Sequence, residues 1–358
     1  MKMPKEKQMQ FQDGGVNTHD RQATAQGYTL FAPLRHDKAY LIDMDGQIVN
    51  QWALNKGGVN RCQLTKDGNL FIAEGSEDGP PLYAGKGGCL REYDWNGKVV
   101  WEHHDGNQHH DARRLPNGNT IYIAWEPLDD LSAKRVKGGL SGTEKEGIIY
   151  GDVIREITPD KEVVWEWRTK EMEIENYPIC PLCPRAEFAH ANTVSPLPNG
   201  DVLISFRVLN TLILVDRKTR KIKWEHTDLS FGHQHDCHFI DNGNILVFCN
   251  GFHGRDVDMA SSVREFNHET GDIVWEYKAQ PLSSFFSANI SGAQRLWNGN
   301  TLICEGYKGC IFEVTSKGDI VWEFVNPYLS PHPAFGTTNW IFRAYRYAPG
   351  VPQLVNLK

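Results

Sequence analysis

Three histidines and one arginine offer the clearest chemistry in this sequence. They are His110, His190, His235 and Arg207. A neutral imidazole can act as a nucleophile or carry a proton near pH 7, and a guanidinium offers a permanent planar cation to anionic oxygens. Three imidazoles can equally hold a divalent metal ion that keeps one position open. Either chemistry requires a fold that brings these four side chains together.

Other polar residues accompany these histidines. Asp111 and Asp236 each directly follow one of them, and we expect them either to orient an imidazole or to hold neighbouring sheets together. His109, His233 and His238 are expected behind the first group, because strand alternation turns at least His109 away. A single histidine at a strand start often only forms a hydrogen bond to a neighbouring element. A functional interpretation therefore requires that several of these side chains converge on one pocket.

The segment CPLCP places Cys180 and Cys183 at the spacing of metal ligands. The sequence shows no partner pair for a zinc knuckle, which favours two thiols, reduced or bridged, that stiffen a loop. The remaining cysteines lie mostly in strand-like segments and are expected to be buried thiols rather than a disulfide framework.

A repeated hairpin supplies the scaffold. Two strand-like runs flank an Asn-Gly or Asp-Gly turn in residues 63–73, 113–124, 195–205, 239–248 and 294–304. These dipeptides favour tight hairpin turns because both central residues take a positive φ. Each hairpin is followed by a second one that ends in a tryptophan, namely Trp101, Trp165, Trp224, Trp275 and Trp322.

Two successive hairpins form a four-stranded antiparallel sheet, which is a propeller blade. A sixth blade is expected to combine residues 28–52, which end in Trp52, with the strand-like segment 337–349. The sequence therefore predicts an all-β, six-bladed propeller closed by N- and C-terminal segments that share one blade. We expect a tail over residues 1–25, a single propeller domain over residues 26–358, and tryptophans that pack between blades.

Propeller topology indicates which side chains share a face. The start of each innermost strand, the end of each second strand and the loops 126–150 and 169–189 all fall on the face opposite the Asn-Gly turns. His110 and His235 both stand nine residues before their turn residue, and Arg207 ends a second strand. Counterparts of these positions in other blades are Asn60, Asn192, Ser291, Gly75, Trp125, Asn250 and Gly306. The predicted catalytic residues are His110, His190, His235 and Arg207, and the predicted substrate-binding residues are Asn192, Asn60, Trp125 and Asn250.

Composition limits the possible partners. The formal net charge is −7, and the absence of a dense Lys/Arg stripe argues against a nucleic-acid partner. No apolar run approaches the roughly 18 residues that a membrane helix needs, and residues 1–15 lack the apolar core of a secretory signal. We therefore expect a cytoplasmic protein with no membrane partner. The composition does not decide between a monomer and a homo-oligomer.

The segments HHDARRLPNGNT, HANTVSPLPNGDVLISFR and HQHDCHF resemble the arylsulfotransferase family of propeller enzymes, as does FRAYRYAP near the end. The resemblance spans residues 28–349. It implies a six-bladed propeller that moves a sulfuryl group from an aryl sulfate to a phenol with neither a nucleotide sulfate donor nor a cofactor. By motif matching it makes His235 the transiently sulfated nucleophile, gives His110, His190 and Arg207 the other catalytic positions, and makes Asn192 a supporting residue.

Two other functions fit the same residues. A metal-dependent lyase, hydrolase or oxidoreductase would use the histidine cluster as ligands and would lose activity on chelation. A non-catalytic interaction propeller would tolerate replacement of the axial histidines with no effect beyond stability. A sulfotransferase, in contrast, would turn over an aryl sulfate only when a phenol is supplied.

Overall fold

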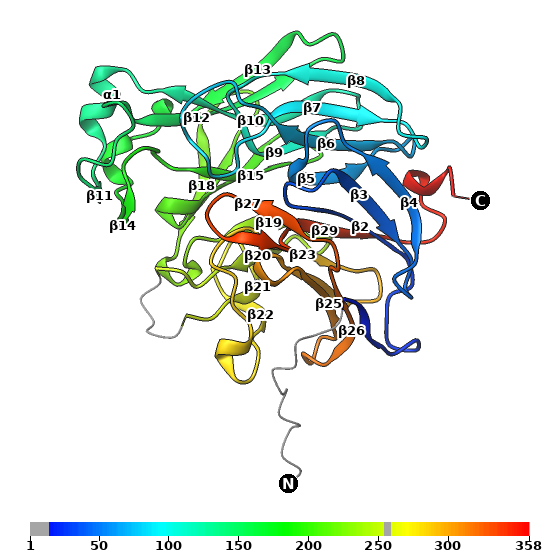
Figure 1. Cartoon of the computed structure of the whole chain (residues 1–358). Helices are drawn as coiled ribbons and strands as arrows, with labels where there is room; N and C mark the ends of the chain where they lie inside the picture. Colours follow the sequence, from blue (N-terminus) through cyan, green and yellow to red (C-terminus); the bar gives the residue numbers. More distant parts are fainter. Residues whose placement is uncertain (1–13, 254–258, 358) are drawn as a thin grey trace.

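The chain folds into a ring of six β-sheets around one axis (Figure 1), and the computed structural model describes residues 14–253 and 259–357. Neighbouring strands within each blade are antiparallel, and each blade runs outward from an inner strand at the axis. The predicted all-β, six-bladed propeller is confirmed.

The first three blades are built from the following strands, in order from the axis outward. Blade 1 contains β29 (Ile341–Tyr347), β2 (Tyr28–Pro33), β3 (Lys38–Ile42) and β4 (Ile48–Ala53). Blade 2 contains β5 (Gly58–Leu64), β6 (Leu70–Gly75), β7 (Gly88–Tyr93) and β8 (Val99–His104). Blade 3 contains β9 (Gln108–Arg114), β10 (Thr120–Pro127), β12 (Tyr150–Ile157) and β13 (Val163–Arg168).

The other half of the ring follows the same plan. Blade 4 contains β15 (Ala191–Pro196), β16 (Val202–Phe206), β17 (Thr211–Val215) and β18 (Ile222–Thr227). Blade 5 contains β19 (His235–Phe239), β20 (Ile245–Cys249), β21 (Ser262–Phe266) and β22 (Ile273–Tyr277). Blade 6 contains β23 (Gly292–Arg295), β24 (Thr301–Glu305), β25 (Cys310–Val314), β26 (Ile320–Val325) and β1 (Gly15–His19).

Both ends of the chain contribute to closing the ring. β29 pairs antiparallel with β2, with Tyr347 opposite Tyr28, so the segments expected to share a blade do so. Strand β1 adds to the outer edge of blade 6 by pairing with β26. Sequence reasoning assigned residues 15–19 to a tail, whereas this short strand belongs to a propeller sheet.

A ring of tryptophan hydrogen bonds joins the blades at their outer strands. Each indole N–H donates to a backbone carbonyl in the outer turn of the next blade, with N···O distances of 2.8–3.0 Å. The pairs are Trp52 with Asp94, Trp101 with Pro159, Trp165 with Arg217, Trp224 with His268, Trp275 with Ser316, and Trp322 with Met44. The last pair links blade 6 back to blade 1. The predicted packing role of these tryptophans is confirmed.

A buried arginine crosses the axis below the inner strand starts. Arg343 on β29 donates to the carbonyl of Asn192 at 2.7 Å and to Thr193 Oγ1 at 2.9 Å. Its other terminal nitrogen lies 3.3 Å from Asp111 Oδ2 and 3.5 Å from Asp236 Oδ1. We call Arg343, Asp111 and Asp236 the hub. A buried cation between two carboxylates joins sheets that are far apart in the sequence.

The hub carboxylates also bond to backbone in neighbouring blades. Asp111 accepts a hydrogen bond from the Val194 N–H at 3.0 Å, and Asp236 accepts one from the Ala293 N–H at 3.2 Å. Tyr345 donates to Asp236 at 2.7 Å. Of the two roles expected for these aspartates, the structure shows the one that holds blades together.

The inner strands are irregular where they begin. Strands β9, β15 and β19 each shift register against their partner near this end. His110, His190 and Asp236 have φ values of 53°, 55° and 53°, which lie in the left-handed region. Such bulges redirect side chains that simple alternation would place elsewhere.

Two long connections pack on each other beside blades 3 and 4. The connection after β10 contains α1 (Asp130–Arg135) and β11 (Gly138–Leu140). The connection after β13 contains η1 (Thr169–Glu171), η2 (Ile174–Asn176) and β14 (Ile179–Pro184), and β14 pairs with β11 in parallel. Arg185 fixes the two together through Glu144 and the Gly138 carbonyl.

The remaining short elements occupy the other loops. They are η3 (Arg207–Leu209), η4 (Leu229–Phe231), η5 (Leu282–Ser284), η6 (Gly306–Lys308), the hairpin of β27 (Ser330–His332) and β28 (Gly336–Thr338), and η7 (Pro352–Leu354). In the part of the chain that the structure describes, no helix is long and apolar enough to span a membrane.

Candidate active site

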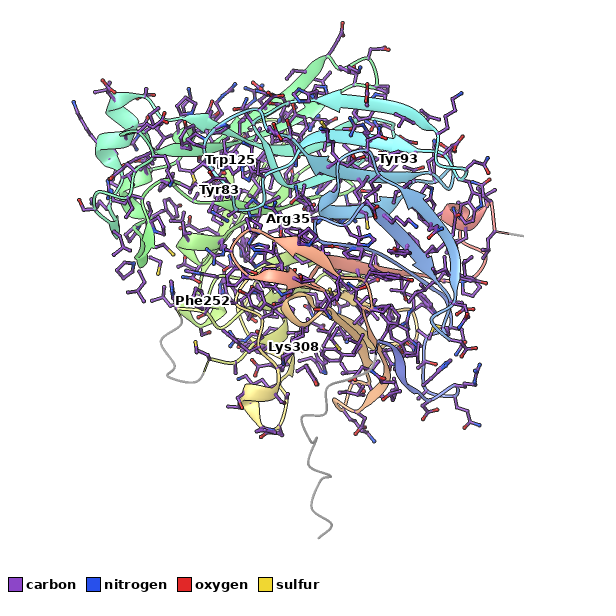
Figure 2. All side chains as sticks on the ribbon, in the orientation of Figure 1. Arg35, Tyr83, Tyr93, Trp125, Phe252 and Lys308 are labelled. Carbon is purple, nitrogen blue, oxygen red and sulfur yellow. The ribbon has the colours of Figure 1, made fainter. Side chains whose placement is uncertain are left out.

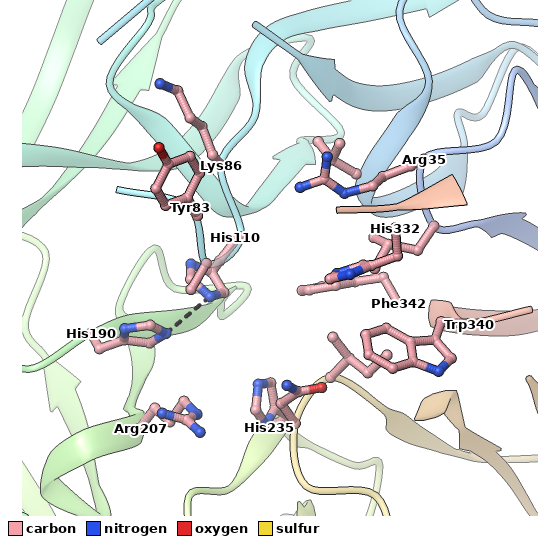
Figure 3. Close-up of a pocket in the computed structure, with 16 residues that line it drawn as sticks. Arg35, Tyr83, Lys86, His110, His190, Arg207, His235, His332, Trp340 and Phe342 are labelled. Atoms are coloured by element: carbon pink, nitrogen blue, oxygen red, sulfur yellow. Dashed lines mark hydrogen bonds between the residues drawn. The ribbon is translucent and has the colours of Figure 1, made fainter. Parts of the chain in front are cut away.

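A cavity of about 200 Å³ opens on the axis at the end where the inner strands begin (Figure 3). His110, His190, His235 and Arg207 all line it. They come from β9, the residue before β15, β19 and η3, so three separate blades supply them. The convergence that the sequence analysis required is therefore present.

The imidazole of His235 has a defined orientation. Its Nδ1 lies 2.7 Å from Asn250 Oδ1 and 3.1 Å from the His233 carbonyl oxygen. The amide nitrogen of Asn250 donates to the Ser287 carbonyl at 2.7 Å, which fixes the amide oxygen toward the histidine. Since both partners of Nδ1 are acceptors, Nδ1 carries the hydrogen and Nε2 keeps its lone pair. Burial, with the nearby Arg207 cation, lowers the pKa of His235 well below 6.5.

His110 and His190 contact each other directly. Their Nε2 atoms are 3.1 Å apart (dashed line in Figure 3). His190 Nδ1 lies 3.1 Å from Glu187 Oε2, and the same carboxylate oxygen accepts a hydrogen bond from the indole of Trp125 at 2.9 Å. Burial alone would raise the pKa of Glu187, but the charge of His190 and its hydrogen bond outweigh that effect, and the pKa is lowered. Glu187 therefore accepts from both neighbours as a carboxylate.

A third imidazole, that of His109, contacts the other ring nitrogen of His110. His109 Nδ1 lies 2.8 Å from His110 Nδ1, and His109 Nε2 lies 3.2 Å from Asp152 Oδ1. Burial raises the pKa of Asp152 and lowers that of His110. We call the connected side chains Asp152, His109, His110, His190 and Glu187 the imidazole row. At one end of the row the carboxyl group of Asp152 lies beside His109, and at the other end the carboxylate of Glu187 lies beside His190.

Arg207 follows strand β16 and is fixed beside the row by its backbone. Its N–H donates to the carbonyl of His190 at 3.1 Å. Burial lowers the pKa of Arg207, and the neighbouring Cys183 and Glu187 act in the opposite direction. An arginine stays charged under these conditions, so the cavity contains a permanent cation.

The rest of the cavity wall includes several aromatic side chains. Tyr83, His332, Trp340 and Phe342 line it, together with Arg35. In Figure 2 Arg35 and Tyr83 lie toward the middle of the ring. The site thus places imidazole and guanidinium groups opposite flat apolar surfaces.

A wider cavity of about 630 Å³ adjoins the first and shares Arg35, Tyr83 and Lys86 with it. Sequence reasoning did not find these wall residues. Arg35 comes from the loop after β2, Tyr83 and Lys86 come from the connection after β6, and His332 and Trp340 come from the connection between β26 and β29. Topology puts these loops on the histidine face, but nothing in their composition distinguished them.

The predicted substrate-binding residues do not line the 200 Å³ cavity. Asn250 lies behind His235, and Trp125 stacks on His109 at a centroid distance of 4.2 Å. Asn192 is fully buried and donates to the Gln234 carbonyl, and Asn60 is also buried. A direct role of these four residues in substrate binding stays a prediction. In the structure, none of them lines the 200 Å³ cavity.

These positions differ from the prediction for a local reason. Counting back from the turns made Asn60, Asn192 and Ser291 equivalent to His110, whereas Val59, His190 and Ile290 line the cavity. Register shifts displace the side chains at the starts of β5 and β15. Before β23 the backbone itself turns, because Ile290 and Ser291 have positive φ values of 52° and 84°.

The three histidines expected behind the first group lie only partly where they were predicted. His109 and His233 contact His110 and His235, while His238 bonds to the Asp236 carbonyl below them. The loops 126–150 and 169–189 were expected over the histidine face, yet none of their residues lines the smaller cavity. They pack on each other instead and reach the site through Glu187 and, in the wider cavity, Glu146.

Comparisons with known proteins bear on the family and the fold of this chain. A family model described as arylsulfotransferase (ASST) matches residues 88–327. No curated protein sequence matches the chain. A solved structure of a protein of unknown function from Bacteroides caccae is similar in fold, with 16% identity, a TM-score of 0.56, and coverage of 90% of this chain and 99% of that one. A streptogramin B lyase structure covers 93% of both chains at 12% identity, with a TM-score of 0.49.

These likenesses differ in what they establish. The Bacteroides protein shows the propeller fold alone, because its identity to this chain is low. The family model covers more than half of the residues, including the segments that hold His110, His190, His235 and Arg207. The chain therefore belongs to the arylsulfotransferase (ASST) family.

Proposed function

We propose that this protein transfers a sulfuryl group from an aryl sulfate to a phenolic acceptor through a sulfohistidine at His235. The observation that carries the proposal is the hydrogen bonding of His235. Its Nδ1 faces two acceptors and carries the hydrogen, which leaves Nε2 as the atom with a free lone pair. Arg207 and two further imidazoles share the same cavity. Family membership supports sulfuryl transfer in general, and the roles of the individual residues follow the expectation from the family resemblance.

In the first step, the Nε2 lone pair of His235 attacks the sulfur of the aryl sulfate. The S–O bond to the aryl group breaks as the N–S bond forms, and the phenolate leaves with the electron pair. Arg207 stabilises the negative charge on the sulfuryl oxygens. A proton from the imidazole row, delivered by His110 or His190, neutralises the leaving oxygen.

In the second step, the acceptor phenol gives its proton to the row and attacks the same sulfur. The N–S bond breaks, and its electron pair returns to Nε2 of His235. The row thus acts first as an acid and then as a base, and Glu187 stabilises the positive charge that His190 carries when the row is protonated. No net proton is consumed over the cycle.

The wall of the cavity supports an aryl substrate. Trp340 and Phe342 offer flat apolar surfaces opposite the imidazoles, and Tyr83 stands at the passage to the wider cavity. Aromatic side chains favour offset or edge contacts with another ring. Donor and acceptor phenols of similar size therefore fit the same space in turn.

Intact mass spectrometry tests the covalent step. The full chain is incubated with an aryl sulfate in the absence of acceptor, and we expect one added sulfuryl group that disappears when a phenol is supplied. The His235→Ala variant should form no adduct and release no phenol. His238→Gln is the matched control, because His238 lies in the same segment but outside the cavity.

Two results would contradict the proposal. One is an adduct that persists in His235→Ala, which would place the nucleophile elsewhere. The other is steady phenol release by His235→Ala at the rate of the unaltered chain, which would remove the covalent step from the mechanism.

A further inference from the structure

Four metal-ligand side chains converge beside the active site, and the proposed mechanism uses none of them. They are Cys180 and Cys183 of β14, His233 before β19, and His253 after β20. One ligand atom from each lies within 4.8 Å of all the others. Both cysteines are free thiols in the structure. The partner pair that the CPLCP segment lacked in the sequence is thus supplied by another blade.

The distances match those of a tetrahedral site. Cys183 Sγ lies 3.6 Å from His233 Nε2 and 3.7 Å from His253 Nδ1, and Cys180 Sγ lies 3.7 Å from the same nitrogen of His253. A zinc ion bound at about 2.3 Å to sulfur and about 2.0–2.1 Å to nitrogen gives tetrahedral S···N edges of about 3.6 Å. A small contraction around an ion would complete the geometry.

The ligand set also selects the kind of metal. Two thiolates and two imidazoles suit zinc, whereas calcium and magnesium prefer oxygen ligands. Four protein ligands leave no open position, which is the arrangement of a structural site. His233 is fully buried and Cys183 nearly so, and both are therefore shielded from competing water.

The position of this cluster connects two blades to the reacting groups. β14 belongs to the connection between blades 3 and 4, while His233 and His253 belong to blade 5. The His233 carbonyl is one of the two acceptors for His235 Nδ1. Cys183 also lies near enough to Arg207 to favour its charged form. An ion here would fix both the nucleophile and the cation of the active site from behind.

We propose that Cys180, Cys183, His233 and His253 bind one structural zinc ion that holds β14 against blade 5. Two thiolates balance the charge of the ion, so the bound site adds no net charge beside Arg207, whose cation stays available to the substrate. Such a site departs from the expectation that Cys180 and Cys183 are two thiols that only stiffen a loop. It does not depend on the sulfuryl-transfer mechanism, because the measurements that test it concern metal content rather than turnover.

Elemental analysis of the full chain, purified without chelator, gives the first test. We expect about one zinc per chain, as a closed four-ligand site requires. Cys180→Ser and His253→Gln should each lower the zinc content at least about tenfold. Cys89→Ser is the matched control, because Cys89 is a nearly buried thiol on β7 outside the cluster.

A spectroscopic test on the unaltered chain gives a result that does not depend on whether the variants fold. The metal is removed from the unaltered chain and replaced with Co²⁺, which in a tetrahedral site with sulfur ligands gives intense visible bands and a sulfur-to-metal charge-transfer band. We expect both bands, and we expect the charge-transfer band to weaken in Cys180→Ser.

Three outcomes would overturn the proposal. The first is a chain that contains no zinc and gives no tetrahedral cobalt spectrum. The second is a disulfide between the two thiols in active, metal-free protein. The third is a metal that persists in Cys180→Ser and His253→Gln but vanishes in His110→Asn, which would place it at the axial imidazoles instead.

Discussion

The axis of this propeller contains two charged clusters that differ in how their charges are satisfied. In the hub, Arg343 is held between the carboxylates of Asp111 and Asp236, and all three side chains are buried. In the cavity, Arg207 and His235 face open space. The inner strands supply residues to both clusters. A cation that is paired inside the protein serves the fold, whereas one that faces a cavity is available for a substrate.

The largest expected effect follows from breaking the hub. Arg343→Met leaves two buried carboxylates without their shared cation, and it should lower the free energy of unfolding by about 3–5 kcal/mol. Chemical denaturation measures this change. Arg135→Met is the control, because the partly exposed ion pair of Arg135 with Glu175 should contribute less than about 1 kcal/mol. Equal losses in the two variants would remove the distinction between buried and exposed pairs.

The second effect concerns the cation of the cavity. Arg207→Met should lower kcat/KM for aryl sulfate turnover by about 10²–10³-fold, because the sulfuryl charge loses its donor. The midpoint of denaturation should change little, in contrast to Arg343→Met. Arg35→Met at the passage to the wider cavity serves as the comparison and should raise KM more than it lowers kcat. An Arg207→Met variant that is inactive only because it is unfolded would contradict this division.

A smaller effect is expected from the end of the imidazole row. Glu187→Gln keeps the shape of the side chain but removes the charge that faces His190. We expect about a 10–100-fold loss in kcat with little change in KM, since the residue acts through His190 rather than on the substrate. A pH profile of kcat that is identical in Glu187→Gln and the unaltered chain would show that the row does not carry the proton.

The smallest effect is a two-stage dependence of stability on pH. Burial lowers the pKa of His110 below 6.5, so its contribution is complete above pH 6.5 and is lost as the pH falls from that value. Burial alone would raise the pKa of Asp236, but Arg343 lowers it below 3.8, so its contribution persists until the pH falls below 3.8. Denaturation at a series of pH values measures both stages. His110→Gln should reduce the first stage, to which the lowered pKa of His235 also contributes, and leave the second unchanged.

Much of the fold was predictable because the repeat has local causes. The Asn-Gly turns fix the hairpins, and a tryptophan such as Trp101 marks the outer strand of each blade. The meeting of His110, His190, His235 and Arg207 followed from topology alone. None of these steps required knowledge of contacts between distant residues.

The remaining parts depend on such contacts. The bulges that bring Val59 to the cavity in place of Asn60, and that keep Asn192 away from it, arise from packing at the axis, which the spacing of turns does not report. Tyr83, His332 and Trp340 of the cavity wall belong to connections between blade strands, and the course of these connections is set by their neighbours. His233 and His253 join Cys180 only because blade 5 lies beside the connection that carries β14.

The place of β29 in the chain has a consequence for synthesis of the protein. β29 follows every other propeller strand in the sequence, yet it is the inner strand of blade 1 and carries both Phe342 of the cavity wall and Arg343. A nascent chain on the ribosome holds all three axial histidines long before this strand emerges. The axial cavity is therefore completed in one late event, when translation has delivered the segment that seals the toroid.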